Sequence, residues 1–136
     1  MQTAVIFPGQ GTQRSGMGAA WREHPAWRGV EEAEATTGEP HGHLLCEADE
    51  ATLARTREAQ LAILLTSLVA WEAVRDSIAA PVAFAGHSLG QVTALIAAGV
   101  LDLATGIEFA AVRAAATQRA ADGHPGRMVA LLGADL

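Results

Sequence analysis

Apolar residues follow two patterns along the chain, short consecutive runs and longer stretches in which they recur every third or fourth position. The short runs predict buried strands at 3–7, 81–85 and 127–132, because they are compact and bounded by Pro, Gly or polar residues. The longest periodic stretch, 59–78, predicts a central helix whose first half is apolar nearly all round. We expect this helix to belong to the core.

Shorter periodic stretches predict further helices, bounded by capping and helix-breaking residues. These helices are expected at 17–24, 27–36, 50–56, 88–98 and 103–121. Strands therefore alternate with helices, which predicts an α/β fold with a mainly parallel sheet flanked by helices.

The junction between the second strand and its helix reads Gly86-His87-Ser88-Leu89-Gly90. This G-x-S-x-G pattern is typical of a nucleophile elbow, a tight turn that exposes a serine hydroxyl. The glycines allow strand and helix to pass closely, and the first helical N–H groups would face an oxyanion. The alternative is an ordinary strand-to-helix turn that carries an incidental serine.

A glycine-rich loop at 9–18 follows the first predicted strand. It contains neither Gly-Lys-Ser/Thr nor G-x-G-x-x-G, so the sequence does not indicate a phosphate or dinucleotide site. By itself the loop is equally well explained as a flexible surface segment or as backbone that approaches a ligand.

The composition excludes several classes of function. The net charge of −6 argues against a nucleic-acid partner, and half of the 136 residues are hydrophobic, enough for one domain with a core. The single cysteine, Cys46, excludes an internal disulfide, and we expect a partly buried thiol there. No segment resembles a signal peptide or is long enough to span a bilayer, so we expect a cytoplasmic protein without a membrane partner.

Two histidines, His41 and His43, flank a glycine, and their imidazole nitrogens could bind a metal ion. No third ligand group lies near them in the sequence. A solvated loop without a metal is therefore the expectation for this segment.

Four ordered blocks resemble one family, the malonyl-CoA:acyl carrier protein transacylases and the acyltransferase domains of polyketide and fatty acid synthases. The blocks are Val5–Gln13 with Gly16–Gly18, then Leu53, Thr56 and Gln60, then Gly86–Gly90 with Ala94–Leu95 and Ala98–Leu101, and Arg113, 25 residues after Ser88. The resemblance covers the whole chain. It implies the α/β-hydrolase-like core of the acyltransferase fold, present here as an incomplete portion.

The resemblance also implies a role for each matching residue. Ser88 would be the nucleophile that takes an acyl group from CoA, and the backbone N–H groups of Gln10 and Leu89 would form the oxyanion hole. Arg113 would hold the free carboxylate of a malonyl-type substrate, since a guanidinium pairs with a carboxylate through two parallel hydrogen bonds. Gln60 would line the acyl pocket.

Substrate and partner follow from the same resemblance. The substrate would be malonyl-CoA, and the acceptor would be the phosphopantetheine thiol of an acyl carrier protein, with no cofactor bound to the chain itself. Leu89 favours plain malonyl over branched extenders. Leu61, Gln91 and Ala114 depart from the family's usual proline, glutamate and glycine.

The family's general base is a histidine well downstream of the arginine, and His87 is expected to be structural. No other histidine in this sequence matches that position. We therefore expect residues 1–126 to be the N-terminal part of the large subdomain and 127–136 to be the truncated first strand of the small ferredoxin-like subdomain. Such a chain would be inactive or weak by itself.

Two other functions remain open from the sequence. One is a non-catalytic remnant or interaction subunit that docks a carrier protein or another chain. The other is a serine hydrolase of lipase or patatin type, which rests on the Ser88 motif alone and leaves the Gln10 loop and Arg113 unexplained.

Overall fold

Two parallel strands and a set of helices make up the part of the chain that the computed structural model describes, residues 2–124, 126 and 133. Strand β1 (Ala4–Phe7) pairs with β2 (Ala83–Gly86) in a parallel register that places Ala4 opposite Ala83 and Phe7 opposite Gly86. The expected α/β class is thus observed. The strand predicted at 127–132 and the subdomain proposed for 127–136 lie outside the described residues, apart from Gly133.

Six α-helices are described, and most match the periodic stretches of the sequence. They are α1 (Arg28–Thr37), α2 (His41–Cys46), α3 (Glu50–Leu53), α4 (Thr56–Val74), α5 (Gly90–Ala97) and α6 (Leu103–Gly123). Short 3-10 helices lie at Ala19–Trp21, Pro25–Trp27 and Arg75–Ser77. Asp102 caps α6 through the Thr105 N–H, as its sequence position predicts. None of the described helices combines the length and hydrophobicity that crossing a bilayer requires.

The prediction of an α-helix at 17–24 is wrong. Only a 3-10 turn forms there, because Gly18 is tied to a distant segment: its N–H donates to the Leu45 carbonyl at 2.9 Å. A Cβ on Gly18 would lie 2.7 Å from the Leu45 side chain. Contact with α2 therefore replaces the local hydrogen bonds of a longer helix.

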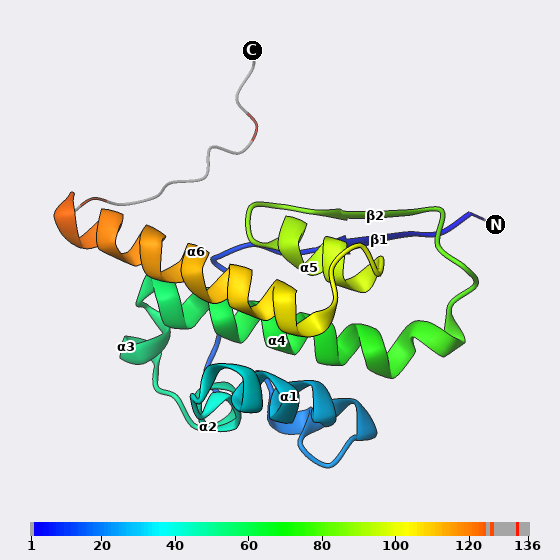
Figure 1. Ribbon diagram of the computed structural model, residues 1–136, viewed down its shortest axis with the longest axis horizontal. Helices are drawn as coiled ribbons and strands as arrows, with labels where there is room; N and C mark the ends of the chain where they lie inside the picture. Colours follow the sequence, from blue (N-terminus) through cyan, green and yellow to red (C-terminus); the bar gives the residue numbers. More distant parts are fainter. Residues whose placement is uncertain (1, 125, 127–132, 134–136) are drawn as a thin grey trace.

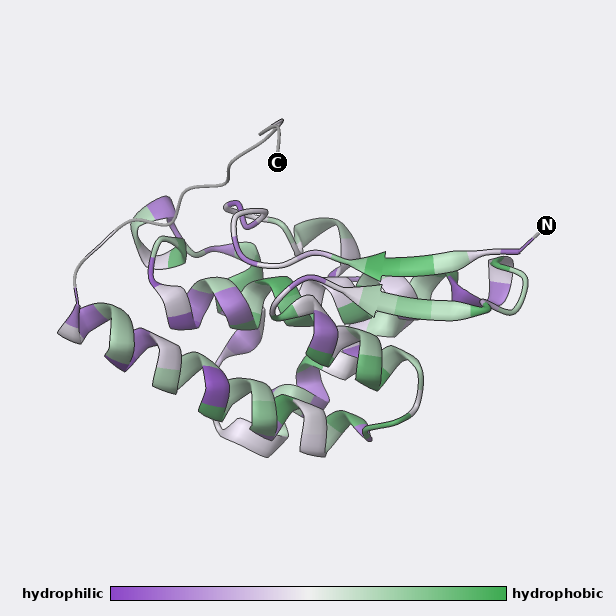
Figure 2. Ribbon diagram, turned by 90° about the horizontal axis from the view of Figure 1, so that it is seen from above, coloured by the Kyte–Doolittle hydropathy of each residue, from purple (hydrophilic) through white to green (hydrophobic). Residues whose placement is uncertain are grey.

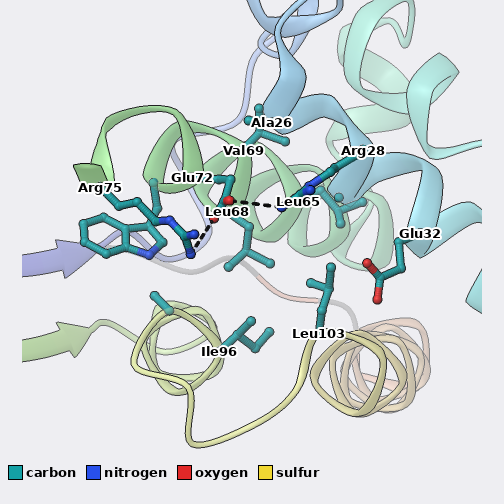
Figure 3. A pocket seen from close by; sticks show the side chains of 13 residues that line it. Ala26, Arg28, Glu32, Leu65, Leu68, Val69, Glu72, Arg75, Ile96 and Leu103 are labelled. Atoms are coloured by element: carbon teal, nitrogen blue, oxygen red, sulfur yellow. Dashed lines mark hydrogen bonds and ion pairs between the residues drawn. The ribbon is translucent and has the colours of Figure 1, made fainter. Parts of the chain in front are cut away.

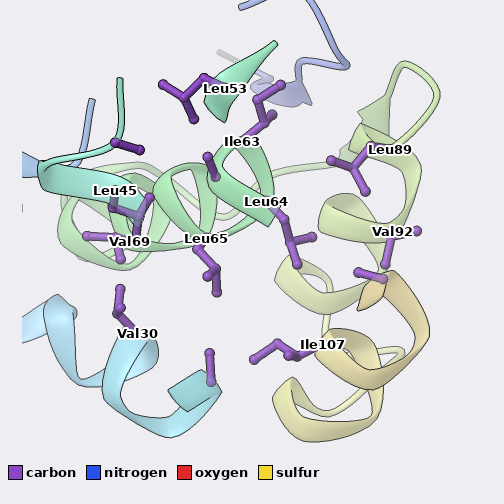
Figure 4. Packing of buried hydrophobic residues seen from close by; sticks show 14 of the residues in the cluster. Val30, Leu45, Leu53, Ile63, Leu64, Leu65, Val69, Leu89, Val92 and Ile107 are labelled. Atoms are coloured by element: carbon purple, nitrogen blue, oxygen red, sulfur yellow. The ribbon is translucent and has the colours of Figure 1, made fainter. Parts of the chain in front are cut away.

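Helix α4 forms the centre of the core (Figure 1). Every residue from 59 to 65 is buried, which confirms the expectation of an all-round apolar first half. Leu64 and Leu65 lie between Val30 of α1 on one side and Val92 and Ile107 of α5 and α6 on the other (Figure 4). Burying such a leucine stabilises the fold by about 1.5–3 kcal/mol.

The strands are less buried than the sequence predicts. Phe7 is buried, but Ile6 is 74% exposed and Val82, just before β2, is 63% exposed. Helix α5 contacts both strands, while the hydrophobic outer side of the pair lies open in the view from above (Figures 1 and 2). The apolar runs identified the strands correctly, but among the described residues helices cover only one of their faces.

Strand β2 turns directly into α5, and two glycines make this possible. A Cβ built on Gly86 would lie 1.9 Å from the Gly90 carbonyl oxygen, and one on Gly90 would lie 2.3 Å from the Phe7 carbonyl oxygen. Such contacts are far inside van der Waals distance. Any side chain at either position would push the strand, the turn and the helix apart.

We expect Gly86→Ala to lower the free energy of unfolding by about 1–3 kcal/mol or more, because the neighbouring atoms are backbone that must shift. Gly123→Ala at the end of α6 is the matched control, since its Cβ would meet nothing within 4 Å. Urea unfolding followed by circular dichroism measures both variants. Equal midpoints for the two variants would contradict the packing argument.

Candidate functional site

Ser88 occupies the turn between β2 and α5 with its residue exposed to solvent. Its φ of 52° is the only positive value among the described non-glycine residues. Hydrogen bonds hold the turn: the Gly90 N–H donates to the His87 carbonyl at 2.8 Å, and the His87 N–H donates to the Phe7 carbonyl at 3.1 Å. The surrounding backbone therefore imposes a conformation that serine rarely adopts, a feature that is concentrated at functional sites.

Arg113 reaches this serine from α6. Its Nη2 donates to Ser88 Oγ at 2.9 Å, across 25 positions of sequence, and its Nη1 donates to Gln60 Oε1. Arg57, by contrast, forms an ion pair with Glu39. No described carboxylate forms an ion pair with Arg113. A half-buried cation beside the serine thus has only neutral partners.

Gln60 connects the two long helices below the site. Its side chain is 3% exposed, and its Nε2 donates to Thr117 Oγ1 at 2.8 Å. Sequence reasoning missed Thr117. The available signal was its position four residues after Arg113, one turn further along the same face of α6.

The loop after β1 lies against the Ser88 turn. A Cβ on Gly9 would lie 2.7 Å from the His87 carbonyl oxygen, so the loop that carries Gln10 packs on the turn itself. Within the described residues, the backbone N–H groups of Gln10 and Leu89 donate no hydrogen bond. Leu89 belongs to the core, and the whole residue is 1% exposed. Neither amide has an acceptor in the described part of the chain.

Ser88, Arg113, Gln60 and Gln10 together line a pocket of about 940 Å³. None of them lines a smaller pocket of about 390 Å³. The larger pocket is lined by Gln10, Ala54, Thr56, Gln60, His87, Ser88, Arg113, Thr117, Ala121, His124 and Gly126. Four of the five residues that the sequence singled out are therefore brought together here. Leu89 contributes no lining side chain. The volume is sufficient for a small organic ligand or the acyl end of a larger one.

The smaller pocket lies between α1, α4, α5 and the start of α6 (Figure 3). Its floor is apolar, and Glu72 bridges Arg28 and Arg75 at its rim, at 3.5 and 3.1 Å. Its charged groups neutralise one another and no nucleophilic side chain lines it. Of these two pockets, only the one around Ser88 is lined by a serine hydroxyl beside a cation that has no ion-pair partner among the described residues.

Comparison with known proteins places this geometry in context. The family model described as "Acyl transferase domain" matches residues 4–134. The Malonyl CoA-acyl carrier protein transacylase of Bacillus subtilis (strain 168) is 37% identical over 134 residues, covering 97% of this chain and 42% of the relative. The mitochondrial Malonyl-CoA-acyl carrier protein transacylase of Homo sapiens is 35% identical over 139 residues, covering 96% and 35%. A mitochondrial relative means that the similarity by itself does not specify the cytoplasm.

Solved structures agree with the sequence matches. The acyl-carrier-protein S-malonyltransferase of Burkholderia pseudomallei 1710b superposes with a TM-score of 0.81 at 34% identity, covering 88% of this chain and 40% of that one. A type II PKS acyl-carrier protein in complex with its malonyl-transacylase gives 0.80 at 33% identity, with coverage of 88% and 40%. The chain thus spans about two fifths of the length of the bacterial proteins that it matches.

His41 and His43, which do not line this pocket, differ from expectation. The prediction of a solvated loop is wrong, because His41 and His43 lie in helix α2 and His41 is 1% exposed. Thr37 Oγ1 donates to the Ala33 carbonyl, so it accepts from His41 Nε2, 2.7 Å away. His43 is exposed and pairs with Glu47. Within the described part of the chain, no three His, Cys, Asp or Glu side chains are grouped as metal ligands.

Burial also affects two titratable groups of α2, those of His41 and Cys46. It lowers the pKa of His41 below its ordinary value of 6.5, because the charged imidazolium loses its hydration. It raises the pKa of the half-buried Cys46 thiol, which confirms the expectation of an unreactive, partly buried cysteine.

We expect the fold to lose stability as the pH falls from about 7.5 to about 5.5. The unfolded chain protonates His41 near its ordinary pKa of 6.5, whereas the folded chain does so only at lower pH. The unfolded state therefore binds more protons in this window, with a limiting slope of about 1.4 kcal/mol per pH unit. Urea unfolding across the window measures the slope.

His41→Gln should flatten this pH dependence, whatever its effect on stability at neutral pH. Glu39 does not contribute to the slope in this window. A hydrogen bond from Arg57 lowers the pKa of Glu39 below the ordinary value of 4.5, so this carboxylate titrates only at a pH below the window. An unchanged slope in the variant would show that His41 is not the group responsible.

Proposed function

The chain belongs to the acyl transferase domain family, and from this membership we propose that it moves a malonyl-type acyl group from CoA to an acyl carrier protein through an acyl-Ser88 intermediate. One observation carries the proposal. A guanidinium without an acidic partner, that of Arg113, lies 2.9 Å from an exposed serine hydroxyl in one pocket. A malonyl thioester presents a free carboxylate one methylene away from the carbonyl carbon that the serine would attack.

In the first step Ser88 Oγ attacks the thioester carbonyl of malonyl-CoA. The C–O bond forms and the C–S bond breaks, the proton of the hydroxyl is transferred to the departing CoA thiol, and the acyl group remains on Ser88 as an ester. The turn that carries Ser88 would act as a nucleophile elbow. The N–H groups of Gln10 and Leu89, which have no acceptor in the described residues, would donate to the developing oxyanion.

In the second step the phosphopantetheine thiol of an acyl carrier protein attacks the ester. The C–S bond forms, the C–O bond breaks, and the thiol proton restores the Ser88 hydroxyl. The solved complex of an acyl-carrier protein with its malonyl-transacylase supports a carrier protein as the acceptor. The chain itself then needs no bound cofactor, since phosphopantetheine belongs to the carrier.

Arg113 would select the acyl group by its charge. Substrate entry replaces the Nη2 contact with Ser88 by contacts with the malonyl carboxylate, while Nη1 stays on Gln60. The hydroxyl is a neutral acceptor and the carboxylate a charged one, so the exchange adds an ion pair with the guanidinium and frees the hydroxyl. A hydrolase of lipase type has no comparable use for this cation.

Incubation with malonyl-CoA that is radiolabelled in the acyl group should label the chain on Ser88, slowly if no histidine of this sequence acts as the base. Ser88→Ala should abolish the label, because only the hydroxyl can carry the ester. Ser77→Ala, at an exposed serine that does not line the pocket, is the matched control and should keep it. Label that survives in Ser88→Ala would reject the acyl-serine mechanism.

Arg113→Gln should reduce labelling by malonyl-CoA by about tenfold to a hundredfold relative to labelling by acetyl-CoA, since only malonyl uses the cation. Arg119→Gln, an exposed arginine on the same helix, is the control and should leave the ratio unchanged. Equal losses for both acyl donors in Arg113→Gln would mean that Arg113 does not recognise the carboxylate.

A further inference from the structure

A buried amide beneath the site is held between a guanidinium and a hydroxyl. The Gln60 side chain contacts Arg113 through Oε1 and Thr117 through Nε2, and it is almost fully buried. A carboxamide has a donor end and an acceptor end of nearly identical shape, so packing alone does not choose between its two orientations. The choice depends on which neighbours donate and which accept.

Arg113 can only donate, so the carbonyl oxygen of Gln60 faces it, and the Thr117 hydroxyl receives the other end of the amide. Thr117 Oγ1 lies 3.0 Å from the carbonyl oxygens of both Arg113 and Ala114, so its single proton is directed to the backbone of its own helix. The hydroxyl therefore faces Gln60 as an acceptor, 2.8 Å from Nε2. The amide NH₂ must face Thr117, and the carbonyl oxygen must then face the arginine.

The orientation of the amide is passed on to the guanidinium. Gln60 Oε1 accepts a hydrogen bond from Arg113 Nη1. Because this bond holds Nη1 in place, Arg113 Nη2 points at Ser88 Oγ. The opposite amide orientation would place NH₂ donors against a guanidinium that has no acceptor, which is unfavourable in a buried position. Thr117 thus acts on the Ser88–Arg113 pair without touching Ser88.

We infer that Thr117 is a positioning residue, which fixes the Gln60 amide and through it the direction of the Arg113 fork that a substrate carboxylate would meet. The inference rests on the proposed function for its consequence, the recognition of a carboxylate. Its structural part, the ordered amide, is independent of that function and is measurable by itself.

The first test is nuclear magnetic resonance of the Gln60 side-chain amide. In the unmodified chain its Nε2 protons should exchange with solvent much more slowly than those of Gln91, which is exposed. Thr117→Val removes the acceptor at nearly constant volume and should remove this protection, whereas Thr117→Ser should restore it. Fast exchange in the unmodified chain would overturn the inference even if Thr117→Val fails to fold.

The second test is the binding of malonate, with uncharged malonamide as the comparison, followed by chemical-shift titration. Thr117→Val should weaken malonate binding by about tenfold and leave malonamide unaffected, with recovery in Thr117→Ser. Thr36→Val is the matched control, because the Thr36 hydroxyl also donates to its own helix, at the Glu32 carbonyl, but accepts from no buried amide. Malonate affinity that is equal in Thr117→Val and Thr36→Val would overturn the inference.

The two proposals fail in different ways. If Arg113→Gln leaves malonate binding unchanged while Gln60 remains protected, carboxylate recognition is wrong and the amide assignment stands. If Ser88 is labelled and Arg113→Gln weakens malonate binding, but Thr117→Val does not, the proposed function stands and the positioning role is wrong.

Discussion

The contact between the backbones of Gly86 and Gly90 is the constraint on which the site depends. With only 1.9 Å between the position of a Cβ and a carbonyl oxygen, the strand and the helix meet as bare main chain. The same helix start rests on the Phe7 carbonyl of the neighbouring strand. One contact region therefore determines where the serine projects and where the loop after β1, which carries Gln10, begins.

Core and site share a second connection through α4. This helix contributes more buried residues than any other described helix, yet it carries Gln60 in a run that is otherwise apolar. A buried amide must be hydrogen-bonded, and both of its partners, Arg113 and Thr117, lie on α6. Satisfying a polar group in the core thus also aligns the pocket wall, so the packing of α4 against α6 and the geometry around the serine are not independent.

Local patterns in the sequence predicted much of the fold and part of the site. The glycines around Ser88 and the cap at Asp102 are recognisable because their causes lie within a few residues. The helix expected at 17–24 failed because Leu45, far along the chain, takes over the hydrogen bonding of Gly18. Apolar strand residues indicate a strand but not what covers it. The role of Arg113 came only from family resemblance, and Thr117 was missed because its partner is 57 positions away.

The left-handed backbone conformation of Ser88 favours glycine for stability, whereas the proposed mechanism needs a serine at the same position. Glycine would adopt a φ of 52° without the strain that a Cβ introduces, so the fold by itself would be better served by a residue that has no hydroxyl. Selection for thermal stability alone would therefore favour Ser88→Gly. A library screened for thermostability alone should therefore lose the Ser88 hydroxyl, the proposed nucleophile, while the scaffold around the turn is kept.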